Sequence, residues 1–549
     1  MNCRKRMRMF EVGRDIFKNG FRGGGTGVAG RGRLRFIHCL FILAFGLFIA
    51  RTLQLGIQGT DRSRHAGAVG NWTVSRADIV DRNGDILAKN IMSGHITLRP
   101  GHVRNHDAVA ELIHSLLPYE YSLADALRLV NSSRRFVYIK KYASDAARAA
   151  VKKARLEGLE VEDIQTRRYP KRRLFSHIVG YVNVEGRGMD GAERIFDEYL
   201  RENSDPLRLS LDSRVQSVFY EQLSAAMSKY QAKGAMGLLM NSRTGEMVAM
   251  VSLPDFDPEN RSADPVGHRT FMPMRGVFEM GSIFKIFNTA MAMENGITKE
   301  YYVAEPYKIL DKFGRTAARI SDVRSFKPPR PHLSVEEIML HSCNAGSAQI
   351  ALDLPDGAQK EFFHRLHMDE RLELEFGRTE RTLIPAKWGP VERATMSFGH
   401  GISVTPMHLI MAVNAMTNGG IYIYPTLHKR SVGAVSGTRV LAPEISARLR
   451  AVMVRVAEET SGKKARVAGI QIGGKTATAE KWVNGKVDHK KNLTAFAGIF
   501  PGDAPQYTIL VILDEPKGTA ETFGLRTAAW NAVPTTGKIL DSILPLLFE

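Results

Sequence analysis

Cysteine is scarce in this sequence of 549 residues, which contains only Cys3, Cys39 and Cys343. Residues 59–549 hold just one of the three, so no disulfide can close within them. The 16 histidines are scattered, and neither H-E-x-x-H nor a cysteine–histidine cluster at metal-ligand spacing occurs. These absences exclude a disulfide-stabilised scaffold, and they predict a protein with no metal and no other cofactor.

Features typical of nucleic-acid binding are also missing, although the formal net charge is +19. Residues 1–35 contain ten Lys or Arg and two acidic residues, so +8 of this charge lies in a short tail. The chain has no Arg-aromatic repeat and no zinc-finger spacing. We therefore expect no nucleic-acid partner, and we expect residues 1–35 to form a disordered basic tail.

Long hydrophobic runs are limited to one segment, FIHCLFILAFGLFIA at residues 36–50, with further apolar residues as far as Ile57. Residues 36–58 are long enough for one membrane-spanning helix, which needs about 20 residues, and Arg51 can extend its charge to the interface. The alternative is a cleaved signal peptide, but the basic region is too long and no small-x-small cleavage site follows. The preceding positive charge predicts a single-pass anchor with a cytoplasmic N-terminus.

A nucleotide site is suggested by GIQIGGKT at residues 469–476, which fits the phosphate-loop pattern, and by the strand-like TILVILDEP at 508–516. A phosphate loop needs a long helix after its Lys-Thr pair, but the turn signal Asn484-Gly485 follows too soon. A chain outside the cytoplasm would also meet no ATP. The turn signals instead predict an antiparallel meander, with strands at 469–483, 493–500 and 507–513, and no nucleotide.

The chain changes character near residue 206. Residues 59–205 mix short apolar alternations with an Ala- and charge-rich helix at 143–156, which predicts a mixed α+β region. Beyond it we expect a strand at 207–211, a helix at 215–229, an apolar hairpin at 235–253 and a helix at 282–294.

Ser282-Ile283-Phe284-Lys285 is the first candidate for chemistry, although Ser-x-x-Lys alone is a weak signal and recurs at Ser461–Lys464. One interpretation is structural, because serine is common at helix starts. The other is catalytic. Lys285 lies one turn after Ser282 on the same helix face, and its apolar neighbours would desolvate it and lower its pKa, which makes it a plausible base for the hydroxyl.

The triplet Ser342-Cys343-Asn344 and the pair Lys475-Thr476 follow in the order of the three-motif set of penicillin-interacting serine enzymes. The resemblance extends over roughly residues 36–549 and is to class B penicillin-binding proteins, most closely the division-specific septal peptidoglycan D,D-transpeptidases. Further segments that resemble this family are SRADIVDRNGDILA (75–88), GRGMDGAE (186–193), LSLDSRVQ (209–216), the stretch 241–257 and SFGHGISVTP (397–406).

The resemblance implies an α+β architecture. Residues 59–205 would form a pedestal of the class B dimerisation type, and residues 206–549 a transpeptidase domain with a five-stranded antiparallel sheet flanked by helices. The N-terminal part would be the tail and the anchor helix. The family location is the inner (cytoplasmic) membrane, with the catalytic domain periplasmic and the protein at the division septum.

The resemblance also implies roles for the motif residues. Ser282 would attack the penultimate D-alanine carbonyl of a stem pentapeptide, with Lys285 as its base. Ser342 and Asn344 would pass protons and position the substrate, and Lys475 would complete their network. An amine from a neighbouring stem would then take the acyl group and form the cross-link.

Thr476 and Thr478 share one face of the expected strand, which in the family holds the terminal carboxylate of the substrate. The backbone N–H groups of Ser282 and Thr478 would form the oxyanion hole, typically worth a few kcal/mol. Simple alternation turns Lys475 to the opposite face, so how it reaches Ser342 stays open.

Ala477 departs from the family, which normally has Gly after Lys-Thr. A methyl costs little at negative φ, but it could shift the Thr478 N–H. The alternative function is therefore a catalytically impaired scaffold of the division complex. The partners that the family implies are stem pentapeptides, β-lactam antibiotics, the membrane, a polytopic lipid II polymerase and other division proteins.

Overall fold

The computed structural model describes residues 76–548, except 324, 325, 432, 434, 484 and 485, together with residues 40, 42–46 and 49. The predicted tail lies outside these residues, and so does most of the predicted anchor at 36–58. Within the described part of the chain, no helix has both the length and the apolar character needed to cross a bilayer. The described residues between 76 and 548 belong to one compact unit.

The pedestal is built on two long antiparallel strands, β2 (Ile86–Leu98) and β4 (Leu159–Arg168), which pair along ten residues. β2 also pairs with β1 (Ile79–Val80) and β3 (Val137–Lys140). A tight turn joins β1 and β2, and in it the Asp81 carboxylate accepts hydrogen bonds from the Asn83 and Asp85 amides.

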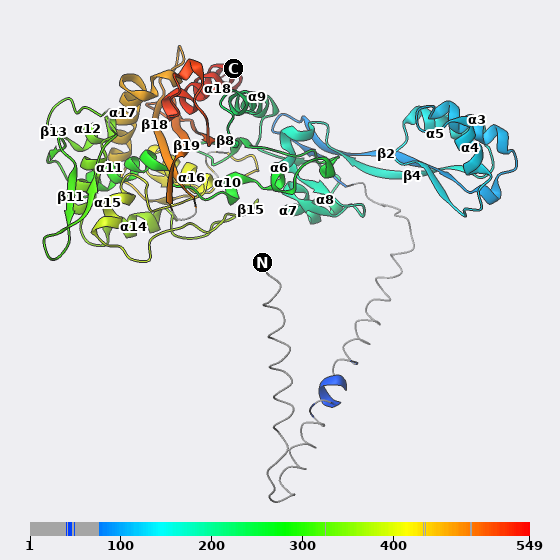
Figure 1. Ribbon diagram of the computed structural model, residues 1–549, viewed down its shortest axis with the longest axis horizontal. Helices are drawn as coiled ribbons and strands as arrows, with labels where there is room; N and C mark the ends of the chain where they lie inside the picture. The colour runs from blue at the N-terminus through cyan, green and yellow to red at the C-terminus, as the bar shows by residue number, and fades with distance from the viewer. Residues whose placement is uncertain are drawn as a thin grey trace, which may run out of the picture. The chain divides into compact units, whose positions relative to one another are not determined.

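Three helices cover one end of the β2/β4 ribbon in Figure 1: α3 (His106–Leu116), α4 (Leu123–Val130) and α5 (Asp145–Ala154). Each begins at a side chain that accepts a backbone N–H, namely Asn105, Ser122 and Ser144. Their apolar faces meet β2 and β3 in a separate small core. The helix predicted at 143–156 is confirmed as α5, two residues shorter at each end.

The opposite end of the pedestal consists of short elements around a buried cluster of charge. These elements are α6 (Ser176–Val179), β5 (Tyr181–Val182), β6 (Gly188–Asp190), α7 (Gly191–Ile195) and α8 (Asp197–Glu202). Glu193 on α7 accepts hydrogen bonds from Arg76 Nε at 2.6 Å and Arg167 Nε at 2.7 Å. All three side chains are at most 2% exposed.

The C-terminal part of the chain, for which the resemblance implies a transpeptidase domain, contains a five-stranded antiparallel sheet in the order β18-β19-β20-β8-β9. Its strands are Gly473–Val483, Lys486–Phe500, Tyr507–Asp514, Gly234–Asn241 and Met247–Leu253. The predicted meander is therefore confirmed, with its turn at 484–485 outside the described residues. A phosphate loop is excluded, because Lys475 and Thr476 lie within β18 and pair with Ala497 and Phe496.

Helices cover both faces of this sheet (Figure 1). Alternate residues of β20 point to opposite sides, with Ile509 and Val511 in one apolar cluster and Leu510 and Ile512 in another. The first cluster includes α9 (Ser213–Lys229) and α18 (Ala532–Leu547). The second includes residues of α11 (Lys285–Glu294), α16 (Pro406–Thr417) and α17 (Pro443–Glu459).

Smaller elements complete the domain. The helices are α10 (Met272–Arg275), α12 (Val335–Leu340), α13 (Asn344–Asp353), α14 (Ala358–Arg365) and α15 (Pro390–Met396). The two-stranded pairs are β10 (Tyr301–Tyr302) with β13 (His332–Leu333), β11 (Tyr307–Leu310) with β12 (Thr316–Ile320), β14 (Glu373–Leu374) with β15 (Gly377–Arg378), and β16 (Ile421–Tyr422) with β17 (Thr438–Arg439).

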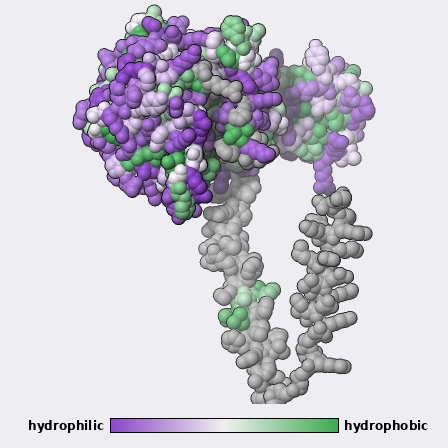
Figure 2. Space-filling view, turned by 60° about the vertical axis from the view of Figure 1, so that its left-hand side comes forward, coloured by the Kyte–Doolittle hydropathy of each residue, from purple (hydrophilic) through white to green (hydrophobic). Residues whose placement is uncertain are grey.

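Two sequence predictions need correction. The strand predicted at 207–211 is only β7 (Leu207–Arg208), because its backbone pairs with the two residues of β1 and then makes a single bridge from Leu209 to His428. The helix predicted from Ser282 begins with a 3₁₀ turn, η5 (Gly281–Phe284), before α11. The surface of the large domain visible in Figure 2 is mainly hydrophilic, since its apolar residues fill the two clusters on the sheet.

Candidate active site

Ser282 lies in the 3₁₀ turn η5, and Lys285 is the first residue of α11. Their side chains are in contact. Lys285 Nζ lies 2.9 Å from Ser282 Oγ. Ser282 is the second residue of η5 and not its N-cap, which is Met280. The lysine is 1% exposed, because the surrounding residues of η5 and α11 are buried and apolar.

The triplet at 342–344 joins this pair. Ser342 lies between α12 and α13 with φ of +60°, a left-handed conformation that is uncommon for residues other than glycine. Lys285 Nζ donates to Asn344 Oδ1 at 2.6 Å and lies 3.4 Å from Ser342 Oγ. The structure therefore brings the serine, the lysine and the triplet, which are separated by about sixty residues of sequence, into one network.

Lys475 enters the network from β18. Its Nζ donates to Ser342 Oγ at 3.0 Å and to the Thr476 carbonyl at 3.3 Å. Lys475, Ala477 and Ala479 are 1–2% exposed and face inward, so the predicted alternation holds. The open question is answered by tertiary packing, because Ser342 lies on the buried side of the strand.

Burial shifts the pKa of both lysines downward. Desolvation lowers the pKa of Lys285 to about 8, opposed by the negative charge of Asp322. Desolvation also lowers the pKa of Lys475 well below its usual value, and the charge of Lys285 lowers it further. Among the described residues, no carboxylate forms an ion pair with either ammonium, so the charge of Asp322 offsets only part of the desolvation of Lys285. The predicted direction for Lys285 is confirmed.

Thr476 and Thr478 lie on the other face of β18 and remain partly exposed. The Thr476 hydroxyl is 3.1 Å from Ser461 Oγ, and the Ala528 N–H donates to Thr478 Oγ1 at 3.1 Å. Ser461 opens the second Ser-x-x-Lys match. This match is therefore not a second nucleophile–base pair, because the Lys464 ammonium lies 3.6 Å above the Trp530 ring.

The backbone near Ser282 runs close to Thr478. A Cβ added at Gly281, where φ is +50°, would lie 3.4 Å from the Thr478 carbonyl oxygen and 3.5 Å from the Ala479 Cβ. This approach places the start of the Ser282 turn beside the strand whose N–H groups could bind an oxyanion.

Ala477 is accommodated within a regular strand. It pairs with Ala495, and the register of β18 with β19 is unbroken until Glu480. The methyl group packs in the main apolar cluster. The extra methyl therefore leaves the strand pairing at Thr478 regular.

Asp322 is a residue of the site that sequence reasoning missed. Its carboxylate accepts hydrogen bonds from the Asn344 and Ala345 amides at the start of α13, the latter at 3.3 Å. It holds the first turn of the helix that presents Asn344. A single Asp in the segment after β12 has no pattern in the sequence that could have revealed this contact.

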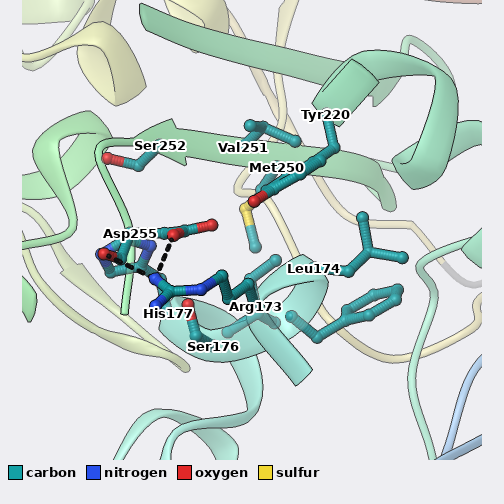
Figure 3. A pocket seen from close by; sticks show the side chains of 11 residues that line it. Arg173, Leu174, Ser176, His177, Tyr220, Met250, Val251, Ser252 and Asp255 are labelled. Atoms are coloured by element: carbon teal, nitrogen blue, oxygen red, sulfur yellow. Dashed lines mark hydrogen bonds and ion pairs between the residues drawn. The ribbon is translucent and has the colours of Figure 1, made fainter. Parts of the chain in front are cut away.

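A small pocket lies apart from these residues, between η2 (Arg172–Phe175) and α6 of the pedestal and α9 and β9 of the transpeptidase domain. Figure 3 shows Arg173 reaching toward Asp255, to which it donates at 3.0 Å. None of the predicted site residues lines this pocket. In the described part of the chain, no group of three or more His, Cys, Asp or Glu residues could hold a metal ion.

A serine and two buried lysines gathered by three motifs between a five-stranded sheet and helices define a serine acyl-transfer enzyme of the penicillin-interacting class. Comparisons with known proteins identify the family. The penicillin-binding protein transpeptidase domain matches residues 235–534, and the penicillin-binding protein dimerisation domain matches residues 72–205. The chain belongs to the penicillin-binding proteins, a family of serine-type D-Ala-D-Ala transpeptidases.

Curated relatives are similar over nearly their full length. The probable peptidoglycan D,D-transpeptidase FtsI of Caulobacter vibrioides is 30% identical, over 93% of this chain and 88% of its own. The probable peptidoglycan D,D-transpeptidase PenA of Neisseria gonorrhoeae is 28% identical, over 88% of both chains. The peptidoglycan D,D-transpeptidase FtsI of Escherichia coli is 26% identical, over 92% of this chain and 90% of its own.

Proposed function

We propose that this protein cross-links peptidoglycan stem peptides during septal cell-wall synthesis through an acyl-serine intermediate. The observation that carries the proposal is the 2.9 Å contact between Ser282 Oγ and a buried Lys285 whose pKa is lowered to about 8. A lysine in this state is a base poised near neutral pH. The names of the relatives, which are peptidoglycan D,D-transpeptidases, support the substrate class.

In the first half-reaction, neutral Lys285 takes the proton of Ser282 as its oxygen attacks the carbonyl of the penultimate D-alanine. The oxyanion is stabilised by the backbone N–H groups of Ser282 and Thr478. When the C–N bond breaks, the departing D-alanine amine receives a proton through Lys285 and Ser342. The acyl group is left as an ester on Ser282.

In the second half-reaction, the amine of a neighbouring stem attacks this ester. The amine loses a proton to Lys285, and Ser282 regains one as the C–O bond breaks. Asn344 fixes Lys285 by accepting its hydrogen bond at 2.6 Å, and Lys475 orients Ser342 at 3.0 Å. Thr476 and Thr478 present hydroxyl groups on the exposed face of β18 for the terminal carboxylate of the substrate.

We also propose that β-lactams inhibit the protein by acylating Ser282, since their strained amide occupies the place of the D-Ala-D-Ala bond. The pedestal would comprise residues 59–205 and the transpeptidase domain residues 206–549. Residues 36–58 would anchor the chain in the inner membrane, with the N-terminus cytoplasmic, the catalytic domain periplasmic and a polytopic lipid II polymerase as a partner. The septal role rests on the resemblance to division-specific members of the family.

The test is labelling of membranes with a fluorescent penicillin, comparing the wild type with Ser282→Ala. We expect a labelled band near 61 kDa that disappears in the variant. A band that survives would contradict the choice of nucleophile. Absence of a band from both proteins would favour the impaired-scaffold alternative, and depletion of the protein with inspection of septa would test the division role separately.

A further inference from the structure

Glu279 and His400 lie on two chain segments that run side by side next to Ser282. Phe278 forms a bridge with Val404, and the Gly401 N–H donates to Glu279 Oε1 at 2.8 Å. A Cβ at Gly399, where φ is +80°, would lie only 2.2 Å from the Gly281 carbonyl oxygen. The segment 399–404 is thus held tightly against the residues that lead into the nucleophile.

Two polar atoms in this arrangement lack partners. Glu279 Oε2 and His400 Nδ1 are both buried, and neither makes a hydrogen bond with any described residue, including each other. Glu279 also makes no ion pair within the described part of the chain. A buried acceptor without a donor is destabilising, so two of them beside the proposed nucleophile give reason to look for a ligand.

Glu279 lies partly buried in a place where a positively charged partner would stabilise its carboxylate. Burial raises the pKa of Glu279, and the Gly401 N–H and the neighbouring His400 only partly oppose this shift. The two residues are near the reacting groups, because the His400 ring contacts Phe398 with centroids 5.3 Å apart, and the Phe398 ring lies 5.8 Å from Lys285 Nζ.

We propose that Glu279 and His400 form a subsite that binds a primary ammonium group of a peptidoglycan stem peptide. An ammonium offers three donors and no acceptor. A carboxylate oxygen and an imidazole nitrogen, in the tautomer protonated at Nε2, are two acceptors that match it, and a charge-assisted bond to the carboxylate is the stronger. Both side chains are partly exposed, so rotation about the terminal torsion of Glu279 presents Oε2 to the substrate.

This inference rests on the proposed transpeptidase function and assigns specificity within that site. The ammonium has two sources: the side chain of a diamino acid in the donor stem, or the nucleophilic amine of the acceptor stem. Both carry the same chemistry, and the two half-reactions separate them. A donor contact changes the acylation rate, whereas an acceptor contact changes how the acyl-enzyme divides between water and amine.

The first experiment tests the donor stem. It compares two synthetic donors, Nα-acetyl-L-Lys-D-Ala-D-Ala and its Nα,Nε-diacetyl form, and measures the rate at which the full-length protein in detergent releases D-alanine from each. If the donor supplies the ammonium, the wild type should prefer the free amine about tenfold in kcat/KM, as expected for a charge-assisted bond. Glu279→Gln keeps the acceptor for Gly401 N–H but removes the charge, so the preference should fall below threefold. His400→Gln should reduce it less.

The acceptor arm forms the acyl-enzyme from a thioester donor and adds D-alanine as the amine. If the acceptor supplies the ammonium, Glu279→Gln should lower the ratio of aminolysis to hydrolysis about tenfold. The matched control is Glu373→Gln on the exposed hairpin β14/β15, where Glu373 pairs with Arg378, and it should change neither arm.

Acylation by fluorescent penicillin does not depend on an ammonium contact to Glu279. The penicillin should therefore label Glu279→Gln within twofold of the wild-type rate, which would show that the fold is intact. A normal penicillin rate with both the donor preference and the partition ratio unchanged would overturn the subsite. A penicillin rate that falls as much as the peptide reactions would also overturn it, because the effect would then be structural. Failure of the proposed function is distinguishable, since the wild type itself would not be labelled at Ser282.

Discussion

The protein buries charge in two places, and the two clusters are built differently. In the pedestal, Glu193 receives both Arg76 and Arg167, and the two guanidinium groups make further bonds to backbone carbonyls and Asp197. In the transpeptidase domain, Lys285 and Lys475 are equally buried but bond only to hydroxyl, amide and carbonyl oxygens. One cluster pairs opposite charges, and the other places like charges together.

The difference shows what each cluster can do. Ions that are paired and fully hydrogen-bonded stay charged. Removing one member of such a pair leaves the other charge buried without compensation, which is destabilising. Lysines without a counterion lower their pKa and become neutral, which supplies a base. The pedestal cluster therefore connects β4, α7 and the chain before β1. The two lysines of the site cluster instead favour the neutral form, which can accept a proton. Removing a charge should have opposite consequences in the two places.

The largest expected effect follows removal of Lys285, the proposed base. Lys285→Met should slow acylation of Ser282 by fluorescent penicillin by about 10²–10⁴-fold, the range typical of general-base catalysis. Because the methionine replaces a desolvated ammonium with an apolar side chain, the free energy of unfolding should stay equal or increase. The measurements are the labelling rate and a denaturant midpoint. A loss of both rate and stability would show that Lys285 is a structural ion like those of the pedestal.

Removal of the central charge in the pedestal should act on stability instead. Glu193→Ala leaves Arg76 and Arg167 buried without their carboxylate, which should lower the free energy of unfolding by about 3–5 kcal/mol. Equilibrium denaturation of the full chain measures this loss. The control is Glu157→Ala, whose pair with Arg104 is 56% and 84% exposed and should contribute less than about 1 kcal/mol. Equal losses in the two variants would contradict the contrast.

The acylation rate and the stability should both depend on pH through the lowered pKa of Lys285. If the neutral form of Lys285 is the base, as we propose, the acylation rate should rise about tenfold per pH unit below its pKa of about 8 and then level off. For stability, the lowered pKa is a penalty that is fully present below pH 8 and is relieved as pH rises toward 10.5, because the unfolded chain binds the proton more tightly. A flat rate between pH 6 and 9 would argue against Lys285 as base.

Much of this arrangement could be read from the sequence, and the reasons are local. Ser282 and Lys285 are one helical turn apart, and the turn signals around the C-terminal strands predict the meander that excludes a phosphate loop. The apolar residues beside Lys285 also predict the direction of its pKa shift. Each of these inferences depends on neighbours along the chain, which a sequence displays directly.

Contacts between distant segments could not be read in this way. Strand alternation gives the face of Lys475 but not the position of Ser342 beneath it. Asp322 at the start of α13 and the pairing of Glu279 with the segment around Gly401 depend on how loops cross in space. Single acidic residues in loops have no periodic pattern, so only the folded structure reveals them.

The smallest expected effect is at Ala477, where the resemblance to the family implies a glycine. The methyl packs in the apolar cluster beside Lys475, and β18 stays in register with β19 through Thr478. We therefore expect Ala477→Gly to change the penicillin acylation rate by less than about threefold, and to lower stability by about 0.5–1 kcal/mol because glycine is unfavourable within a strand. Stopped-flow labelling and denaturation give the two numbers. An increase in rate of more than tenfold would mean that the methyl does restrain the Thr478 N–H. The site would then combine a competent base with a hindered oxyanion hole, as the alternative of a catalytically impaired scaffold requires.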